Sequence, residues 1–481
     1  MAVLLLLLLW GTRLAGLDVL PLHNDEGLHL RRAVEVWNGH PFWNISDGKI
    51  INHWPIAALY PHNAPDFVGR LPTVMVSLLG LAAGYALACR LFGLWAGVMA
   101  GVLWLTAPYL FFFERLALSD AQAGAWVVVL AWLLLLTVQR GRWWLVISSG
   151  LALATAVLFK FTAVPYAILP VLMLLFGGRW PLRWRVSRLL VLGVVTALCF
   201  VPPLLYLLLR GAEFFSIALG WVGVASNDGS EIAFIANLER LGAQLTGFGT
   251  WAWALLLAVG LGLLALTGRW TGRALLAAGL LPLLIIIVFG SEVLPRHYVV
   301  ALPLLFTLSG MGFGAFLNSL SEGRERWVTA LLVIALLGVS FFPFWLRAQS
   351  DAGTLPLPQA VRTQYIIDHS AGYGLREAMQ ALPGLVKPDA TVIASMFPDS
   401  CRRANFYAEP GFRLTCVAAP GLPEIEQALA AGVVYVLVDN APLIGVDVSA
   451  LGVDAEALAV YPRPGESHES ASVVLWRLQR E

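Results

Sequence analysis

Long runs of apolar residues make up most of the first 350 positions of the chain, and they are separated by short polar segments and by two longer ones, residues 22–69 and 210–249, which we expect to face outward. An α-helix needs about 17–25 mostly apolar residues to cross the hydrocarbon core of a bilayer. Eleven runs approach or reach that length, and they cover residues 2–21, 70–89, 93–113, 121–138, 144–159, 163–178, 188–209, 250–267, 274–290, 298–316 and 327–346. The pattern predicts a multi-pass α-helical membrane protein with about eleven transmembrane helices. The fifth and sixth runs are short, so they form a tight helical hairpin or stop before the far surface.

The composition agrees with this fold class. The chain has 481 residues, of which 59% are hydrophobic and 13% are charged, whereas soluble domains carry about 25% charged residues. The net charge of +1 gives no indication of a nucleic-acid partner. The first residues, MAVLLLLLLW, lack the basic segment and the small-residue cleavage site of a secretory signal peptide. We therefore expect the first run to remain in the protein as a membrane helix.

The distribution of basic residues predicts the orientation, because short cytoplasmic loops are enriched in lysine and arginine. With a cytoplasmic N-terminus, the loops near residues 90, 141, 183, 271 and 325 face the cytoplasm, and each of them carries one to four arginines. The short loops on the other side hold only Arg115, Lys160 and Arg296. We expect a protein of the plasma (inner) membrane whose residues after about 347 are extracytoplasmic.

The hydrophobic pattern changes at about residue 350. The segments DATVIASM, FRLTCVAA, VVYVLVDN and ASVVLWRL predict β-strands, and GLREAMQALPG and PEIEQALAAG predict helices. We therefore expect a transmembrane domain over residues 1–348 and a small extracytoplasmic α/β domain over residues 349–481. Cys401 and Cys416 lie in the second domain, where they form a disulfide in an oxidising compartment or remain two free thiols.

Ionisable residues gather at the outer ends of the predicted spans. They include Asp25, Glu26, His53, Arg115, Asp120, Lys160 and Arg296. Charges at membrane depth are costly and usually functional, although any one of them can also be a snorkelling or solvated side chain at a span end. The adjacent carboxylates Asp25 and Glu26 predict a raised pKa for one of the two, as a general base requires. The inner ends of the spans carry arginines but few acidic residues. This difference between the two ends indicates chemistry, or ion handling, at the outer surface.

Several of these segments resemble the GT-C membrane glycosyltransferases of the protein O-mannosyltransferase and aminoarabinose-transferase type. HNDEGLHLRRA is similar to the family's Asp-Glu element at the start of the first outer loop, which puts Asp25 at the catalytic base with Glu26 beside it. VGRLPTVMVSLLG is similar to the Arg-Leu-Pro entry into the next span. ERLALSDAQAGAW is similar to the Arg-then-Asp element of the second outer loop, with Arg115 and Asp120. The resemblance covers about residues 1–350 and implies a GT-C-like fold.

Three further segments resemble the family's cationic elements. NHWPIAAL is similar to the His- or Lys-Pro-Pro-Leu element, with Trp54 in place of the first proline, and it puts His53 near the carrier phosphate. LFKFTAVPYAILPVLMLL is similar to the Leu-Thr-Lys-Gly segment, with Lys160 at the lysine, and PRHYVVALPLL is similar to the late Arg-Tyr element, with Arg296. The resemblance implies that Lys160, Arg296, Arg115 and His53 bind the phosphate of a sugar donor.

The activity implied by the resemblance is inverting glycosyl transfer from a polyprenyl-phosphate carrier to an acceptor at the outer face of the membrane. Asp25 would act as the general base, while Glu26 and Asp120 orient the acceptor, hold Arg115 or ligate a divalent metal. No compact ligand spacing such as His-Glu-x-x-His is present, so the requirement for a metal stays open. The acceptor is a lipid, a protein or a polysaccharide, and the sugar is a hexose or a pentose.

Two other functions compete with this interpretation. A transporter or flippase for a lipid carrier or glycolipid would also hold charges among its helices, but such proteins favour inverted repeats and charges near the bilayer midplane, and the sequence has neither. A non-catalytic protein of cell-envelope glycan assembly would bind the same carriers. Convergence of Asp25, Asp120, Lys160 and Arg296 on one cavity would favour the transferase.

Overall fold

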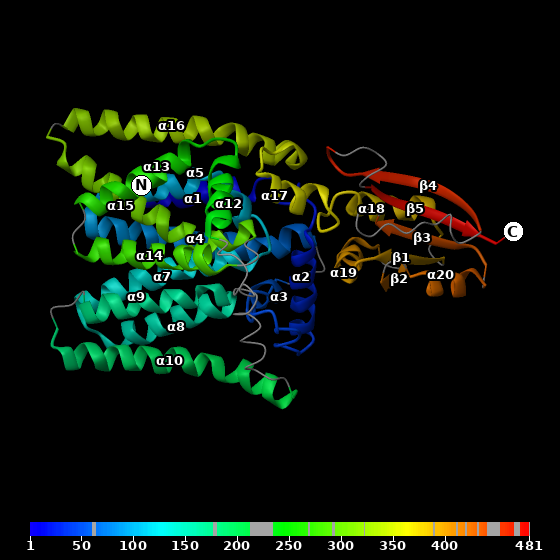
Figure 1. Cartoon of the computed structure of the whole chain (residues 1–481), viewed down its shortest axis with the longest axis horizontal. Helices are drawn as coiled ribbons and strands as arrows, with labels where there is room; N and C mark the ends of the chain where they lie inside the picture. Colours follow the sequence, from blue (N-terminus) through cyan, green and yellow to red (C-terminus); the bar gives the residue numbers. More distant parts are fainter. Residues whose placement is uncertain are drawn as a thin grey trace.

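The computed structural model describes residues 1–59, 64–176, 180–211, 234–267, 270–290, 294–321, 323–387, 390–409, 412–418, 421–430, 432–439, 453–465 and 472–480. A bundle of helices forms one part of the molecule, and a five-stranded sheet with its helices forms the other (Figure 1). The helices α2 and α17 lie between the two parts. The chain therefore combines a membrane-type bundle with a separate α/β layer.

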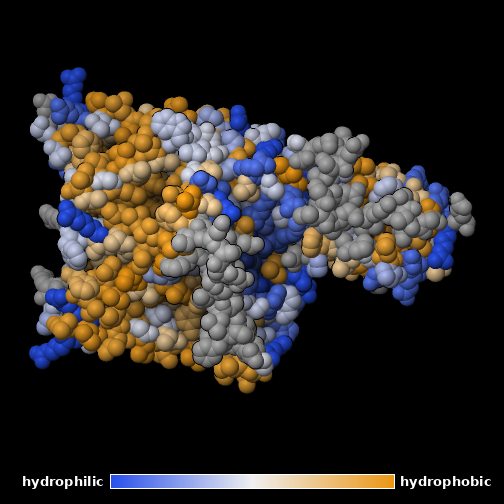
Figure 2. Space-filling view, in the orientation of Figure 1, coloured by the Kyte–Doolittle hydropathy of each residue, from blue (hydrophilic) through white to orange (hydrophobic). Residues whose placement is uncertain are grey.

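The bundle consists of helices of very different lengths. They are α1 (Ala2–Leu14), α4 (Pro65–Phe92), α5 (Leu94–Thr106), α6 (Pro108–Glu114), α7 (Ser119–Arg140), α8 (Trp143–Phe159), α9 (Ile168–Val171), α10 (Leu182–Leu209), α12 (Phe234–Gly247), α13 (Ala252–Thr267), α14 (Trp270–Phe289), α15 (Leu302–Ser319) and α16 (Gly323–Ser350). Short 3-10 or π-helical turns are η1 (Phe161–Ala167), η2 (Leu172–Phe176) and η3 (Pro295–Val300). On the face shown in Figure 2, apolar residues cover most of the bundle, and hydrophilic residues gather at its junction with the α/β part.

The prediction of a multi-pass helical membrane protein is confirmed, but fewer helices than expected are long enough to span a bilayer. Six helices of the described chain pass that test, and eight spans result if each of two bent helix pairs counts as one. The expected run 93–113 is one of these pairs, because the chain bends by 67° between α5 and α6 at Pro108. The runs 2–21, 144–159 and 163–178 correspond to shorter apolar helices.

The centre of the bundle is packed through small residues. In the most hydrophobic windows of α7 and α15, 78% of the residues are buried, against 11% in α10 and 22% in α16. A Cβ atom added at Gly310 of α15 would lie 2.2 Å from the backbone nitrogen of Ala100 in α5. One added at Gly314 would lie 2.3 Å from the Cβ atom of Ala96. Glycine therefore lets the two helix backbones touch, as is common between membrane helices.

Polar and amphipathic elements form the junction between the bundle and the sheet. These are α2 (Asn24–Trp37), α3 (Trp54–Ala57), η4 (Ala352–Thr354), α17 (Gln359–Arg362) and η5 (Thr363–Ile367). Helix α2 begins at a capping box, in which the side chain of the N-cap residue His23 accepts a bond from the backbone, and Glu26 bonds the backbone nitrogen of His23. This cap fixes the start of α2, where Asp25 lies.

The C-terminal part contains one mixed sheet with the strand order β2-β1-β3-β5-β4. Its strands are β1 (Thr391–Met396), β2 (Arg413–Ala418), β3 (Val434–Asp439), β4 (Asp454–Pro462) and β5 (Ser472–Gln479), and its helices are α18 (Leu375–Leu385), α19 (Pro398–Tyr407) and α20 (Leu422–Leu429). Strands β1, β2 and β3 are parallel, and β5 runs antiparallel to β3 and β4. Parallel connections need crossover helices, and α19 and α20 supply them.

The four strands and two helices predicted after residue 350 are confirmed as β1, β2, β3, β5, α18 and α20. Helix α19 and strand β4 were not predicted. The open choice for the outer cysteines is resolved in favour of a disulfide, which joins Cys401 of α19 to Cys416 of β2. This bond attaches α19 to the sheet.

Candidate active site

Asp25 lies between two cations. Its Oδ2 atom is 2.5 Å from Nη1 of Arg296 and 3.5 Å from Nζ of Lys49. Arg296 belongs to η3, whereas Lys49 belongs to the loop between α2 and α3. Lys49 is also 3.4 Å from Asp47, which in turn pairs with Arg32 at 3.1 Å. Three segments that are far apart in the sequence therefore meet at the first turn of α2.

A second ion pair joins Asp120, in the first turn of α7, to Lys160, at the end of α8. Both side chains are buried. The backbone of Lys160 is extended because α8 ends there and η1 begins, so the lysine side chain turns toward Asp120. Lys160 interacts electrostatically with Arg296 and Lys49, and Arg296 interacts with Asp120. Two carboxylates and three cations therefore share one region at the end of the bundle.

The charges around Asp25 keep it ionised. Burial acts to raise the pKa of Asp25, but the positive charges of Lys49 and Arg296 act in the opposite direction and dominate. The pKa of Asp25 is therefore held well below its ordinary value. Burial likewise acts to lower the pKa of Arg296, and the negative charge of Asp25 raises it above its ordinary value. The pair is thus a carboxylate and a guanidinium at neutral pH.

The prediction that adjacent carboxylates raise one pKa is wrong for Asp25 and Glu26. Glu26 points away from Asp25 and pairs with Arg70, with Nε–Oε1 and Nη2–Oε2 distances of 2.8 Å each. Burial acts to raise the pKa of Glu26, but the charge and hydrogen bonds of Arg70 lower it. Neighbouring residues on a helix do not face each other, so each carboxylate meets its own cations.

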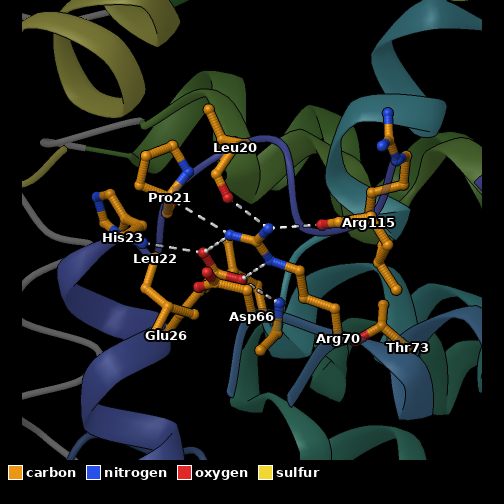
Figure 3. A network of polar contacts seen from close by, with 12 residues as sticks. Leu20, Pro21, Leu22, His23, Glu26, Asp66, Arg70, Thr73 and Arg115 are labelled. Atoms are coloured by element: carbon orange, nitrogen blue, oxygen red, sulfur yellow. Dashed lines mark hydrogen bonds and ion pairs between the residues drawn. The ribbon is translucent and has the colours of Figure 1, made fainter. Parts of the chain in front are cut away.

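The pair of Glu26 and Arg70 organises the segment that leads into α2 (Figure 3). Glu26 also accepts hydrogen bonds from the backbone nitrogens of His23, at 2.9 Å, and Ala117, at 2.7 Å. Arg70 donates to the backbone carbonyls of three residues before α2, namely Leu17, Leu20 and Pro21. Both side chains are fully buried. Their contacts are those of a structural tie between α2, α4 and the preceding segment.

The remaining predicted site residues make other contacts. Arg115 donates to the backbone carbonyls of Ala15 and Gly16 and lies 4.9 Å from the ring centre of Phe111. His53 contacts the carbonyl of Pro41 at 3.4 Å. The structure therefore brings Asp25, Asp120, Lys160 and Arg296 together, and it holds Glu26, Arg115 and His53 in separate networks.

The imidazole of His53 is neutral at neutral pH. Burial, and then the nearby charge of Arg32, lowers the pKa of His53 to about 4. A neutral imidazole offers no positive charge to a phosphate.

Two residues that contact Asp25 or Arg296 were not predicted from the sequence. Lys49 is one of only three lysines in a chain that contains 31 lysines and arginines together, and the rarity of lysine was a signal that could have found it. Tyr365 of η5 interacts with Arg296, and its ring lies 4.5 Å from the ring of His23. Tyr365 is only 1% exposed. Its segment, TQYII, matches no motif, so the sequence carried no signal for it.

Within the described part of the chain, no group of three or more histidine, cysteine, aspartate or glutamate side chains is arranged to hold a metal ion. The two carboxylates of the site are instead bound to cationic side chains. The local charge is therefore balanced by lysine and arginine.

Comparisons with known proteins find similarities in part of the sequence and in the whole fold. Residues 54–206 match the family model described as Dolichyl-phosphate-mannose-protein mannosyltransferase. This range contains Asp120 and Lys160 but not Asp25 or Arg296. A comparison with curated proteins finds no match.

The fold is similar to that of ArnT from Cupriavidus metallidurans. The structure of ArnT bound to undecaprenyl phosphate has a TM-score of 0.68 and 16% identity, and the match covers 98% of this chain and 97% of that chain. ArnT in the apo state has a TM-score of 0.67 and 14% identity, with the same coverage. The Archaeoglobus fulgidus oligosaccharyltransferase in complex with Zn and sulfate has a TM-score of 0.52 and 11% identity, and the match covers 91% of this chain and 67% of that chain. Residues 54–206 therefore match the dolichyl-phosphate-mannose-protein mannosyltransferase model, and the chain as a whole has a fold similar to that of ArnT.

Proposed function

We propose that the protein is an inverting glycosyltransferase that moves a sugar from a polyprenyl-phosphate carrier to an acceptor at the non-cytoplasmic face of the plasma membrane. The observation that carries the proposal is the contact of Asp25 with both Lys49 and Arg296, close to the pair of Lys160 and Asp120. A carboxylate surrounded by cations suits a reaction in which an acceptor loses a proton while a phosphate departs. The similar structure of ArnT holds undecaprenyl phosphate, which supports a polyprenyl-phosphate donor.

The reaction needs one base and one set of phosphate-binding cations. The acceptor oxygen or nitrogen forms a bond to C1 of the sugar, and the bond between C1 and the phosphate oxygen breaks. The acceptor proton passes to the carboxylate of Asp25, and the electrons of the broken bond leave with the polyprenyl phosphate. Attack from the side opposite the phosphate, without an enzyme nucleophile, inverts the configuration at C1.

The cations of the site are assigned to the leaving phosphate. Lys160, Arg296 and Lys49 would stabilise the negative charge that develops on it. Asp120 would hold Lys160 in position through their ion pair. Glu26 and Arg115 would act on the shape of the site through the backbone that they bind, and a neutral His53 would support its loop.

Donor binding would also prepare the base. In the free protein, Lys49 and Arg296 hold the pKa of Asp25 well below its ordinary value, against the effect of burial, and a carboxylate with so low a pKa is a weak base. A donor phosphate that binds the same cations would offset part of their charge. The pKa of Asp25 would then rise, since burial raises it, and the base would strengthen only when a donor is present.

The distribution of charge along the helices supports the proposed orientation. Helix α7 begins beside Asp120 and ends at Arg140, and α8 begins after Arg142 and ends at Lys160. At about 1.5 Å per residue, these arginines lie at the opposite end of the bundle from the site. Arginine-rich ends are typical of the cytoplasmic side, so the site and the α/β domain would face outward.

A transfer assay with the purified protein tests this function. The full-length protein in lipid nanodiscs is incubated with a panel of labelled polyprenyl-phosphate sugars and with candidate lipid, protein and polysaccharide acceptors. We expect the wild type to transfer one of these sugars with inversion, and Asp25→Asn to lose at least about a hundredfold in rate, the scale of general-base catalysis. Glu35→Gln is the matched control, because Glu35 is another carboxylate of α2 and pairs with Arg31 at 2.6 Å. Equal transfer by the wild type and Asp25→Asn would remove Asp25 from its role.

A further inference from the structure

The segment before α2, residues 17–23, is held from two sides. The bundle holds it through Arg70, whose guanidinium binds backbone carbonyls of the segment. The α/β domain holds it through three side chains: Arg376 of α18, and Arg403 and Tyr407 of α19. Arg376 donates to the carbonyls of Asp18, at 2.8 Å, and Val19, at 3.1 Å. The short segment that leads to Asp25 is therefore a shared structural element of both parts.

Arg403 binds the backbone next to the start of α2. Its Nη1 atom donates to the carbonyl of Leu22 at 3.0 Å and to that of Ser370 at 2.7 Å, and its Nη2 atom donates to the carbonyl of His369 at 3.1 Å. The Ser370 carbonyl also accepts a bond from the backbone nitrogen of Asn24 at 3.0 Å. Arg403 is fully buried. One guanidinium therefore joins α19, the 369–370 turn and the residues just before Asp25.

Tyr407 binds Leu22 as well, through the backbone amide group of Leu22. Its hydroxyl accepts a hydrogen bond from the backbone nitrogen of Leu22 at 2.8 Å and donates one to Oδ1 of Asp66 at 2.7 Å. Asp66 lies in the first turn of α4. Leu22 is thus held at its carbonyl by Arg403 and at its nitrogen by Tyr407, and its side chain is fully buried.

Helices α19 and α2 also pack closely against each other. A Cβ atom added at Gly27 of α2 would lie 3.0 Å from the Cβ atom of Arg403. The hydroxyl of Ser400 lies 3.2 Å from the amide oxygen of Asn24. Figure 1 shows α19 at the edge of the α/β domain that faces α2. The two helices are thus close enough for a shift of one to move the other.

We propose that Arg403 and Tyr407 are positioning residues of the transferase, which hold Leu22 and thereby fix the carboxylate of Asp25 against its two cations. The proposal rests on the function proposed above. It gives the α/β domain a part in the geometry of the reaction, whatever the domain contributes to binding the acceptor. A displacement of a reacting group by about 1 Å can lower a rate by about a hundredfold, so a small shift of Leu22 is sufficient for a large effect.

The test uses full-length protein in nanodiscs and the polyprenyl-phosphate sugar that the wild type transfers. The variants are Tyr407→Phe, which keeps the ring and removes both hydrogen bonds, Arg403→Ala, and Arg403→Lys as a conservative replacement. Arg477→Ala is the matched control, because Arg477 lies in β5 and forms an exposed pair with Glu456. The measurements are kcat, the KM for the donor, the Kd for undecaprenyl phosphate and the melting temperature.

We expect Tyr407→Phe and Arg403→Ala to lower kcat by about tenfold to a hundredfold. The Kd for undecaprenyl phosphate stays unchanged, because neither residue contacts the phosphate-binding cations. Arg403→Lys recovers part of kcat, and Arg477→Ala behaves as the wild type. If Arg403→Ala does not fold, the kcat values of Tyr407→Phe and Arg403→Lys test the proposal.

Two results for the variants would overturn the proposal. An unchanged kcat in the folded variants would show that the contacts do not matter for the reaction. A parallel fall of kcat, donor affinity and melting temperature would show a purely structural role. A wild type that transfers no sugar from any carrier refutes the proposed function itself, and the positioning role falls with it.

Discussion

Glu26 and Arg70 form a fully buried ion pair that ties the first turn of α2 to the first long membrane helix, α4. The two contacts between their side chains are each 2.8 Å long. The carboxylate of Glu26 also accepts hydrogen bonds from the backbone nitrogens of His23 and Ala117, and the guanidinium of Arg70 also donates to backbone carbonyls of the segment 17–23. A network of this kind is sensitive to the loss of either partner, because the remaining charge is buried without compensation.

The substitution Glu26→Gln tests the strength of this network. We expect it to lower the free energy of unfolding by about 3–5 kcal/mol, since it leaves the charge of Arg70 buried and unpaired. The melting temperature of the protein in detergent provides the measurement. The control is Glu456→Gln, whose exposed pair with Arg477 should contribute only about 0–1 kcal/mol. Equal melting temperatures for the two variants would contradict the prediction.

Lys49→Ala tests the residue that the sequence analysis missed. A charge-assisted hydrogen bond contributes about 1.5–3 kcal/mol, so we expect undecaprenyl phosphate to bind about tenfold more weakly or worse. The Kd is measured at low and high salt, because the effect should persist at a buried site. Lys387→Ala is the matched control, since Lys387 is exposed and lies outside the site. A Kd equal to that of the wild type would exclude Lys49 from phosphate binding.

The stability of the protein should depend on pH through His53. Burial lowers the pKa of His53 from 6.5 to about 4, so the unfolded chain takes up a proton at a higher pH than the folded chain does. The folded state therefore loses stability as the pH falls from about 6.5 to about 4. The loss amounts to about 3 kcal/mol at most.

The measurement for this prediction is the pH dependence of thermal unfolding in detergent. His53→Gln should flatten the slope between these two pH values, whereas His40→Gln should leave it unchanged, because His40 is an exposed residue. An unaltered slope in His53→Gln would show that His53 titrates alike in both states.

The disulfide between Cys401 and Cys416 should stabilise the α/β domain. It closes a loop of 15 residues, and the chain-entropy model gives about 3 kcal/mol for a loop of that length. Reduction should therefore lower the temperature at which a protease cleaves the domain. The double variant Cys401→Ala/Cys416→Ala should melt early with or without reductant, and Cys89→Ala/Cys199→Ala should respond as the wild type does. Insensitivity of the wild type to reductant would argue against a stabilising bond.

The sequence predicted the parts of the site that lie at the ends of helices. Asp120 and Lys160 were found because a charge at the end of an apolar run stands out from its surroundings. Lys49 was missed because it lies in a polar loop, where a charge does not stand out from its neighbours, and only the rarity of lysine in the chain marks it; Tyr365 lies in a segment that matches no motif. The prediction that either Asp25 or Glu26 has a raised pKa failed because the partners of the two carboxylates cannot be read from the sequence. The partner of Glu26 is Arg70, 44 positions away, and only the folded chain shows that it is near.

A similar difference separates the elements of the fold that were predicted from those that were missed. Strands β1, β3 and β5 were predicted because each contains a run of apolar residues, most of which are buried. Helix α19 has the polar sequence PDSCRRANFY, packs against α2 and is joined to β2 by the disulfide, and no apolar pattern in its own residues indicated it. The bend between α5 and α6 was not predicted, because the composition of the run 93–113 does not reveal it.

The close contact between α5 and α15 at Gly310 also affects the position of a residue outside the interior of the bundle. Helix α15 begins at Leu302, two residues after η3 ends, so any sideways shift of α15 also carries Arg296. Replacement of Gly310 by even alanine would wedge the helices apart against the backbone of Ala100. Under the proposed function, the position of the guanidinium that binds the donor phosphate would thus depend on residues that never touch the donor, and mutations there would alter turnover while leaving every polar group intact.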